Sequence, residues 1–209
     1  MVNFNSTNGA YPFAGLISDS NGNLFGTTQI GGVFGAGTVF ELAKTTTGYA
    51  AAPTTLVNFN NIDGADPYAG LIADANGNLF GTTVNGGAFN AGTAYKIAKT
   101  ATGFAAAPTT VVSFNHSNGS SPYGGLIADA QGHLLGTAYG GGAFGVGTVF
   151  EIKRSGFVRF AGVAGSHNCH GVTISAFAKE YGGIANAALL LGYATVADLQ
   201  GGVTTYCGQ

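Results

Sequence analysis

Short apolar segments alternate with segments rich in glycine, asparagine and threonine along most of the chain, and the alternation returns at a fixed interval. Phe4, Phe59 and Phe114 lie 55 residues apart, and the apolar pairs that follow each of them come in the same order. A fixed period of this length is typical of propellers, solenoids and other repeat arrays. The pattern therefore predicts three copies of one structural unit, at residues 1–57, 58–112 and 113–152.

The pattern within one copy predicts four short strands, at residues 14–18, 23–28, 37–43 and 49–59. Asn21-Gly22 lies between the first two strands, and this dipeptide supplies the positive φ angles that a tight hairpin turn needs. Four strands in about 55 residues match the size of a β-propeller blade. We expect three aromatic side chains to fill the space between neighbouring blades: Phe4, Phe34 and Phe40.

The number of copies is informative, because closed propellers typically have four to eight blades and three blades would leave open sheet edges. The predicted fold is mainly β, with three four-stranded propeller-like blades that form half of a six-bladed β-propeller. A second chain would complete the ring, so the sequence predicts a homodimer. A partial solenoid capped by the C-terminal segment is the alternative.

The composition changes after the third copy. Residues 153–165 are predicted to be a linker with a closing strand, and residues 166–209 a small α-helical tail with helices at 174–181, 184–191 and 196–200. Cys169 and Cys207 lie near the ends of this tail, and a disulfide between them would close about 40 residues and contribute about 3–4 kcal/mol. Cysteines so placed indicate an extracellular or periplasmic protein, with two reduced buried cysteines as the alternative.

The overall composition narrows the function classes. Charged residues make up 8% of the chain and the net charge is −2. The basic residues form no stripe beyond the short group at 153–159, which argues against nucleic-acid binding. No run of about 18 apolar residues is present, so no membrane span is expected. The first four residues also lack the charged and apolar regions of a signal peptide.

The turn between the first two strands of each copy is a candidate metal site. Carboxylate, amide and carbonyl oxygens gather there, and oxygen ligands suit a hard ion such as Ca²⁺. The alternative is a structural turn in which the aspartate accepts backbone N–H bonds. The candidate ligands are Asp19 and Asn21 in copy one, Asp74 and Asn76 in copy two, and Asp129 in copy three.

The third copy differs from the others at two titratable positions. His133 stands where the other copies have Asn23 and Asn78, and His116 stands where they have Ser6 and Asn61. A histidine can act as a metal ligand or as a general base near neutral pH, so both histidines are candidate catalytic residues. Sequence drift at solvated turns is the alternative. Glu41 and Glu151, which share one repeat position, are expected on a solvated strand face.

Two further groups of residues could bind ligands. Tyr11, Tyr68 and Tyr123 each lie beside or near a proline, and we expect them at equivalent positions on the rim of the array, where they would stack on a glycan or a protein. In the tail, His167, Cys169 and His170 could ligate Zn²⁺. Their spacing matches no common zinc module, and the predicted disulfide would use Cys169.

The repeat carries a long motif, read in copy one as Asn-Leu-Phe-Gly-Thr-Thr at 23–28, Gly-Gly at 31–32 and Gly-Thr-Val-Phe-Glu-Leu at 37–42. It resembles the Gloeobacter/Verrucomicrobia-type repeat family over residues 1 to 152. The resemblance implies an exported protein. The tail, which opens with Asn-Cys-His-Gly at 168–171 and closes with Tyr-Cys-Gly at 206–208, is similar to a C-terminal module of assorted bacterial proteins.

The resemblance also implies an activity, a Ca²⁺-dependent hydrolase that acts on N-acyl-homoserine lactones in quorum quenching. A bound ion would polarise the lactone carbonyl and activate water, with ligands from Asp74 or Asp129 and a histidine of copy three. The chain has no G-x-S-x-G elbow, zinc-lactonase motif, P-loop or dinucleotide fingerprint. The alternative is a non-catalytic extracellular binding or scaffold protein, so the expected partner is a small-molecule substrate, a glycan or a protein.

Overall fold

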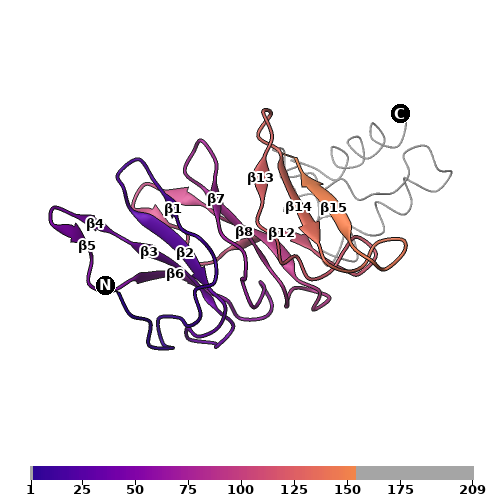
Figure 1. Ribbon diagram of the computed structural model, residues 1–209, viewed down its shortest axis with the longest axis horizontal. Coiled ribbons are helices and arrows are strands. Elements are labelled where there is room, and N and C mark those ends of the chain that lie inside the picture. The colour runs from indigo at the N-terminus through magenta and orange to yellow at the C-terminus, as the bar shows by residue number, and fades with distance from the viewer. Residues whose placement is uncertain (1, 154–209) are drawn as a thin grey trace. The chain divides into compact units, whose positions relative to one another are not determined.

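The computed structural model describes residues 2–153, and every regular element in this range is a β-strand (Figure 1). Contacts within the chain separate a unit of residues Met1–Glu151 from a second unit, Ile152–Gln209. No helix in the described range has the length and hydropathy that a membrane span requires. The predicted closing strand at 156–160, the three tail helices, the predicted Cys169–Cys207 disulfide and the His167–His170 group lie outside the described residues.

Copies one and two fold in the same way, each as a four-stranded antiparallel sheet with a separate two-stranded hairpin. In copy one the sheet order is β1-β2-β3-β6, and the elements are β1 (Ile17–Ser18), β2 (Leu24–Thr28), β3 (Thr38–Leu42), β4 (Lys44–Thr45), β5 (Gly48–Tyr49) and β6 (Thr54–Asn58). In copy two the order is β7-β8-β9-β12, and the elements are β7 (Ile72–Ala73), β8 (Leu79–Thr83), β9 (Thr93–Ile97), β10 (Lys99–Thr100), β11 (Gly103–Phe104) and β12 (Thr109–Ser113).

Copy three contributes a three-stranded sheet within the described range. Its order is β13-β14-β15, from β13 (Ile127–Ala128), β14 (Leu134–Ala138) and β15 (Thr148–Ile152). The structure therefore shows the coarse prediction, an all-β array of small antiparallel sheets. The fourth predicted strand, at 49–59, is instead two elements, because β5 pairs with β4 in the hairpin and only β6 joins the sheet.

A glycine in the middle of the second strand of each sheet allows a large aromatic ring to lie across it. In copy one, Gly26 pairs with Phe40, and a Cβ at Gly26 would lie 2.7 Å from both Phe40 Cζ and Leu16 Cδ2. Gly81 faces Tyr95 and Gly136 faces Phe150 in the same way. The glycine is thus required by packing, since any side chain there would overlap the ring.

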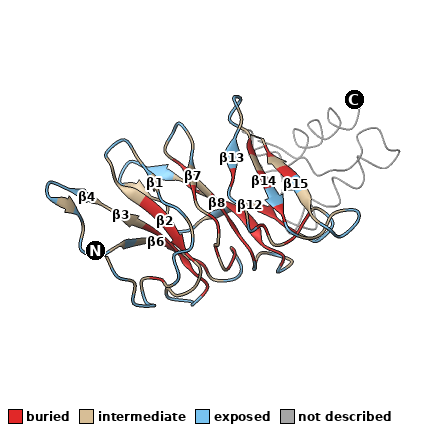
Figure 2. Ribbon diagram, in the orientation of Figure 1, coloured by how far each residue is buried: buried red, intermediate tan, exposed pale blue. Residues whose placement is uncertain are grey.

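The core of each copy contains an edge-to-face pair of aromatic rings. Phe4 packs on Phe40, and the equivalent pairs are Phe59 with Tyr95 and Phe114 with Phe150, with ring centroids 4.9–5.0 Å apart. Such pairs stabilise a core beyond the area that they bury. Figure 2 shows the burial along the central strands, whereas β13 is exposed. The prediction for Phe34 was wrong, because its side chain is 60% exposed.

Neighbouring copies are joined through the segment that precedes the first strand of the next copy. The Thr27 hydroxyl donates a 3.0 Å hydrogen bond to the Ala69 carbonyl, and the Asp66 N–H donates to the Ala36 carbonyl at 3.0 Å. The same backbone bond recurs between the Ser121 N–H and the Ala91 carbonyl at 2.8 Å. These bonds fix where each copy places the segment that carries the exposed aromatic residues described next.

Candidate functional site

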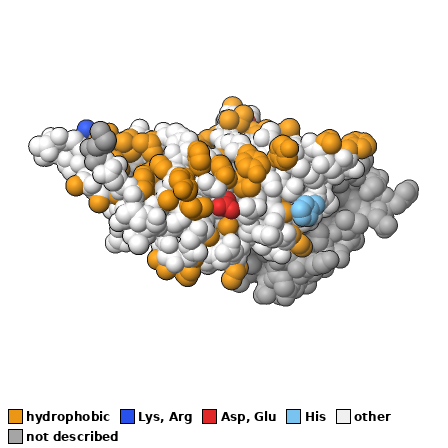
Figure 3. Space-filling view, turned by 60° about the horizontal axis from the view of Figure 1, so that its bottom comes forward, with side chains coloured by type: hydrophobic (Ala, Val, Ile, Leu, Met, Phe, Trp, Pro, Cys, Tyr) orange, Lys and Arg blue, Asp and Glu red, His pale blue; other side chains and the backbone are white. Residues whose placement is uncertain are grey.

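Five aromatic rings form an unbroken series of contacts across the three copies, called here the aromatic row: Tyr11, Phe13, Tyr68, Tyr123 and Tyr139. Their successive ring centroids are 6.4, 5.4, 5.5 and 5.9 Å apart. Four of the side chains are more than half exposed, with Tyr68 partly buried in the middle. Hydrophobic side chains are numerous, and charged ones few, on the face drawn in Figure 3. An exposed contiguous apolar feature of this kind is typical of a binding surface.

The same backbone bend places the row in every copy. The residue before the proline has a positive φ, 57° at Tyr11, 56° at Asp66 and 52° at Ser121. Its carbonyl accepts a 3.1 Å hydrogen bond in each copy, from the backbone N–H of Gln29, Val84 and Tyr139 respectively. A positive φ is uncommon for any residue with a side chain and costs most for a bulky one, so Tyr11 is strained where Asp66 and Ser121 are less so.

The repeat equivalences within the row differ from those predicted. Tyr68 and Tyr123 are equivalent to each other, but their counterpart in copy one is Phe13, and Tyr11 occupies the position of Asp66 and Ser121. All three predicted tyrosines nevertheless lie in the row. Sequence reasoning missed Phe13 and Tyr139. The 55-residue spacing reveals Phe13, whereas Tyr139 has no aromatic counterpart that could have indicated it.

The turns predicted to bind Ca²⁺ are closed by their own hydrogen bonds in copies one and two. Asp19 Oδ1 accepts the backbone N–H groups of Asn21 and Asn23, both at 2.9 Å, and its Oδ2 accepts the Asn23 side-chain amide at 3.0 Å. Asn23 Oδ1 in turn accepts the Lys44 N–H at 2.9 Å. This geometry favours the structural-turn alternative, in which the aspartate organises the hairpin.

Copy two repeats this hydrogen-bond network around Asp74, and the network lowers the pKa of that carboxyl. Asp74 Oδ1 accepts the N–H groups of Asn76 and Asn78, and Oδ2 accepts the Asn78 amide at 2.8 Å. Partial burial acts to raise the pKa of Asp74, but the hydrogen bonds from Asn78 and Asn76, together with the charge of Lys96, lower the pKa below its usual value. The carboxylate form is therefore the one that fits the turn.

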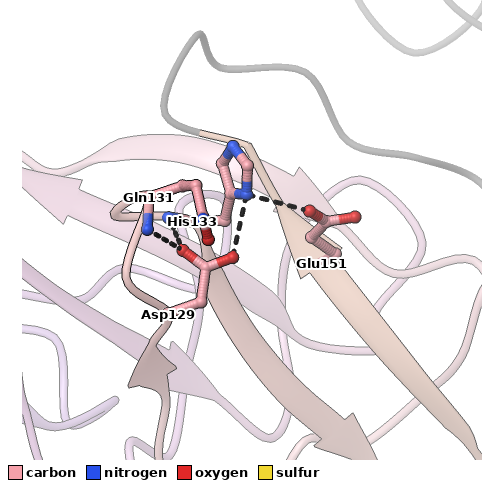
Figure 4. A network of polar contacts seen from close by, with 4 residues as sticks. All are labelled: Asp129, Gln131, His133 and Glu151. Atoms are coloured by element: carbon pink, nitrogen blue, oxygen red, sulfur yellow. Dashed lines mark hydrogen bonds and ion pairs between the residues drawn. The ribbon is translucent and has the colours of Figure 1, made fainter.

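In copy three the turn gains a histidine between two carboxylates. His133 Nδ1 lies 3.0 Å from Asp129 Oδ2 and 3.2 Å from Glu151 Oε1 (Figure 4). Asp129 Oδ1 accepts the N–H groups of Gln131 at 2.9 Å and His133 at 2.8 Å. Asp129, His133 and Glu151 are called here the copy-three cluster. In the described part of the chain it is the group of three metal-ligating side chains whose ligand atoms all lie within 4.8 Å of one another.

The pKa of Asp129 lies below its usual value. Desolvation acts to raise it, but the backbone and side-chain hydrogen bonds from His133, the N–H of Gln131 and the charge of His133 lower it more. Asp129 is thus held as an anion at neutral pH. All three side chains of the cluster are about a quarter to a third exposed, so the cluster lies at the solvent-accessible surface.

The two histidines predicted to be catalytic do not lie together. His133 directly precedes β14, whereas the carbonyl of His116 accepts the N–H of Gly142, beyond the other end of that strand. A five-residue strand spans roughly 15 Å, so the two side chains occupy opposite ends of the sheet. His116 is exposed and its backbone has a φ of 67°. The structure brings His133 and Asp129 together and leaves His116 apart.

Glu151 is a site residue that sequence reasoning placed on a solvated strand face. The strand register of copy one explains why Glu151 lies near His133. There Phe25, two residues after Asn23, pairs with Glu41 on the neighbouring strand. The equivalent pairing in copy three brings residue 151 close to residue 133. The other copies do not repeat the cluster, since copy one has Asn23 with Glu41 and copy two has Asn78 with Lys96.

The repeat region matches a known family. The model of the Gloeobacter/Verrucomicrobia repeat matches residues 1–150, as the sequence motif predicted. A comparison with curated proteins finds no match.

Proposed function

Because the chain belongs to the Gloeobacter/Verrucomicrobia repeat family, with three copies of one unit in series, we propose that it is a binding scaffold whose aromatic row holds a glycan. The observation that carries the proposal is the unbroken contact of five rings across all three copies. Each copy contributes at least one ring through the same backbone bend. A repeated structural unit thus produces a repeated, linear set of stacking positions.

The geometry of the row suits an extended ligand with flat apolar faces. Phe13 and Tyr68 have ring centroids 5.4 Å apart, and Tyr68 and Tyr123 have centroids 5.5 Å apart, so the spacing is nearly constant from copy to copy. Rings that pack on one another have few rotamers left to lose when a ligand binds, which lowers the entropic cost of binding. The C–H faces of pyranose rings can stack on the exposed surfaces of aromatic side chains, and tyrosine hydroxyls add hydrogen bonds.

The charge of the surface favours a neutral polysaccharide. Only 8% of the residues are charged and the net charge is −2, so the chain offers little electrostatic attraction to an acidic glycan. Asp66 lies beside the row, and its Oδ2 accepts the side-chain amide of Asn85 at 2.7 Å. A carboxylate and an amide in this arrangement are partners for sugar hydroxyls at the edge of the stacking surface.

We extend the proposal to the assembly. Three blades that leave sheet edges open would be completed by a second chain, giving a six-bladed β-propeller in a homodimer. An aromatic row on each chain would double the number of stacking positions and raise the avidity for a polymer. The predicted extracellular or periplasmic location fits this role, because polysaccharides of the cell surface and environment are reached there.

The predicted hydrolysis of N-acyl-homoserine lactones remains a prediction, as does its dependence on Ca²⁺. It is tested by measuring lactone opening by the purified full chain with and without EDTA. Hydrolysis that stops with EDTA and returns with Ca²⁺ would support it. Lack of lactone opening in the presence of Ca²⁺ would contradict it.

The glycan proposal is tested by native affinity electrophoresis of the full chain through gels that contain soluble neutral or acidic polysaccharides. We expect retardation in at least one neutral gel, unchanged by added salt, because stacking is not screened by ions. Retardation only in gels that contain acidic polysaccharides, or loss of the retardation at high salt, would contradict the proposal. Migration unchanged in every neutral gel would also contradict it.

A further inference from the structure

The copy-three cluster lies at the start of β14, away from the backbone bend that carries the aromatic row. Its chemistry differs from that of a stacking surface. We infer that Asp129, His133 and Glu151 form a binding site for a divalent transition-metal ion such as Zn²⁺. This inference does not depend on glycan binding. It concerns a separate group of side chains and a separate class of ligand.

The distances within the cluster are those of ligands that share an ion. Zn²⁺ binds imidazole nitrogen and carboxylate oxygen at about 2.0–2.2 Å, and two ligands at tetrahedral positions are then about 3.3 Å apart. His133 Nδ1 lies 3.0 Å from Asp129 Oδ2 and 3.2 Å from Glu151 Oε1. The two carboxylates offer oxygen atoms within 4.8 Å of each other, so rotation of the side chains can bring all three ligand atoms onto one ion.

Hydrogen bonding alone satisfies the cluster poorly. Nδ1 carries at most one hydrogen, so it donates well to Asp129 or to Glu151 but not to both. The second carboxylate then faces the nitrogen and the other carboxylate without a proton between them. A divalent cation removes this conflict, because it accepts an electron pair from all three groups and balances two negative charges.

The ligand atoms are held before any ion binds. Asp129 Oδ1 accepts two backbone N–H bonds, from Gln131 and His133, which fixes the carboxylate and directs Oδ2 toward the imidazole (Figure 4). Glu151 extends from β15, a strand of the same sheet. Outer hydrogen bonds that orient a ligand in this way raise the affinity of metal sites.

The nature of the ligands selects the ion. Ca²⁺ and Mg²⁺ prefer oxygen ligands, whereas imidazole suits Zn²⁺, Ni²⁺, Cu²⁺ and Fe²⁺. A site of one histidine and two carboxylates therefore favours a transition metal over the predicted Ca²⁺. Three protein ligands with partial solvent exposure would also leave a coordination position for water or an exogenous ligand.

The other two copies provide natural variants of the site. Copy one keeps the carboxylates but has Asn23 in place of the histidine, and copy two has Asn78 together with Lys96 in place of the glutamate. Both copies close the same turn through the asparagine amide, at 3.0 and 2.8 Å. His133→Asn and Glu151→Lys therefore insert residues that this fold already holds at these positions.

The test is a titration of the full chain with Co²⁺, followed by its visible absorption and by calorimetry, and a competition with Zn²⁺ and Ca²⁺. All proteins carry Cys169→Ser and Cys207→Ser, so that thiols do not ligate the ion. We expect one Co²⁺ equivalent that Zn²⁺ displaces and an equal concentration of Ca²⁺ does not. We expect His133→Asn and Glu151→Lys each to lower the affinity for Co²⁺ on the order of 100-fold, and His116→Asn to leave the affinity unchanged.

Equal Co²⁺ affinity in His133→Asn and the parent would overturn the inference, as would displacement by equimolar Ca²⁺. A parent that binds no Co²⁺ would also overturn it. Circular dichroism of each variant shows whether the β-structure is retained. If His133→Asn did not fold, Glu151→Lys would decide the question, because its substitution lies outside the turn.

Discussion

The ring of Phe13 stacks on the ring of Tyr68, with centroids 5.4 Å apart and an angle of 22° between the planes, although the two residues are 55 positions apart in the sequence. The repeat period brings them together, because each copy places the residue after its proline at the same point of the array. Tyr68 contacts Tyr123 one copy later at a similar centroid distance of 5.5 Å, but edge to face, with 65° between the planes. A linear row of contacting rings is thus a direct result of the repetition.

Tyr95→Phe should stabilise the protein by about 1 kcal/mol. Tyr95 is fully buried, burial raises the pKa of its hydroxyl, and within the described residues this hydroxyl has no hydrogen-bond partner. Phenylalanine occupies the equivalent position in copies one and three, as Phe40 and Phe150. The free energy of unfolding in urea is the measurement. Phe40→Tyr is the reverse control and should destabilise the fold, and a destabilised Tyr95→Phe would contradict this account of the core.

Tyr11→Asn should increase stability and weaken glycan binding at the same time. Tyr11 has a φ of 57°, which asparagine tolerates better than an aromatic residue, so the strain of roughly 1 kcal/mol would be relieved. The substitution also removes the first ring of the aromatic row. Thermal unfolding and polysaccharide titration of one variant measure both effects. A fall in stability together with unchanged binding would show that Tyr11 has a purely structural role.

The stability of the fold should fall in acid partly through Asp74. Its pKa is lower in the folded protein than in the unfolded chain, where it is about 3.9, so its stabilisation is complete above that value and is lost as the pH falls through the folded pKa. Urea unfolding at a series of pH values below about pH 6 measures the slope. Asp74→Asn should reduce this slope, and Asn78→Ala should reduce it too because it removes the side-chain hydrogen bond. A slope unchanged in both variants would refute the linkage.

The proposed half-ring makes a prediction about mass in solution. Sedimentation equilibrium should give twice the chain mass of 20.8 kDa, because in the proposed assembly a second chain would cover the open edges of the sheets. On dilution the measured mass should fall toward that of one chain, while circular dichroism shows that the β-structure is retained. A monomer at every concentration would contradict the six-bladed assembly and would favour the solenoid alternative.

The repeat pattern was sufficient to predict the second and third strands of a copy, found at Leu24–Thr28 and Thr38–Leu42, because they depend on local chemistry. The first strand, expected at 14–18, covers only Ile17–Ser18, and in the Asn21-Gly22 turn only Gly22 has a positive φ. The pattern was not sufficient for features that depend on the packing of distant residues. Phe34 was expected to fill the space between neighbouring blades, yet it lies in an exposed loop between β2 and β3. One long strand was expected at 49–59, yet the hairpin of β4 and β5 separates its first part from the sheet.

In the candidate sites, too, some residues were predictable from the sequence and others became evident only from the packing of the sheets. Tyr68 and Tyr123 were predicted from their prolines, but ring contact between copies depends on how neighbouring sheets pack. His133 was singled out because it departs from the repeat, whereas Glu151 follows the repeat and carried no such signal. Only the pairing of β14 with β15 in one sheet brings Glu151 within 3.2 Å of His133.

The central claim is that the aromatic row binds a neutral polysaccharide, and calorimetric titration of matched variants tests it most directly. The double substitution Tyr68→Ala with Tyr123→Ala removes the two rings that join the copies, while Phe144→Ala removes a ring that is 90% exposed and lies outside the row. We predict that the double variant loses affinity by at least about tenfold and that Phe144→Ala binds as the parent does. Equal affinity in the parent and the double variant would contradict the claim.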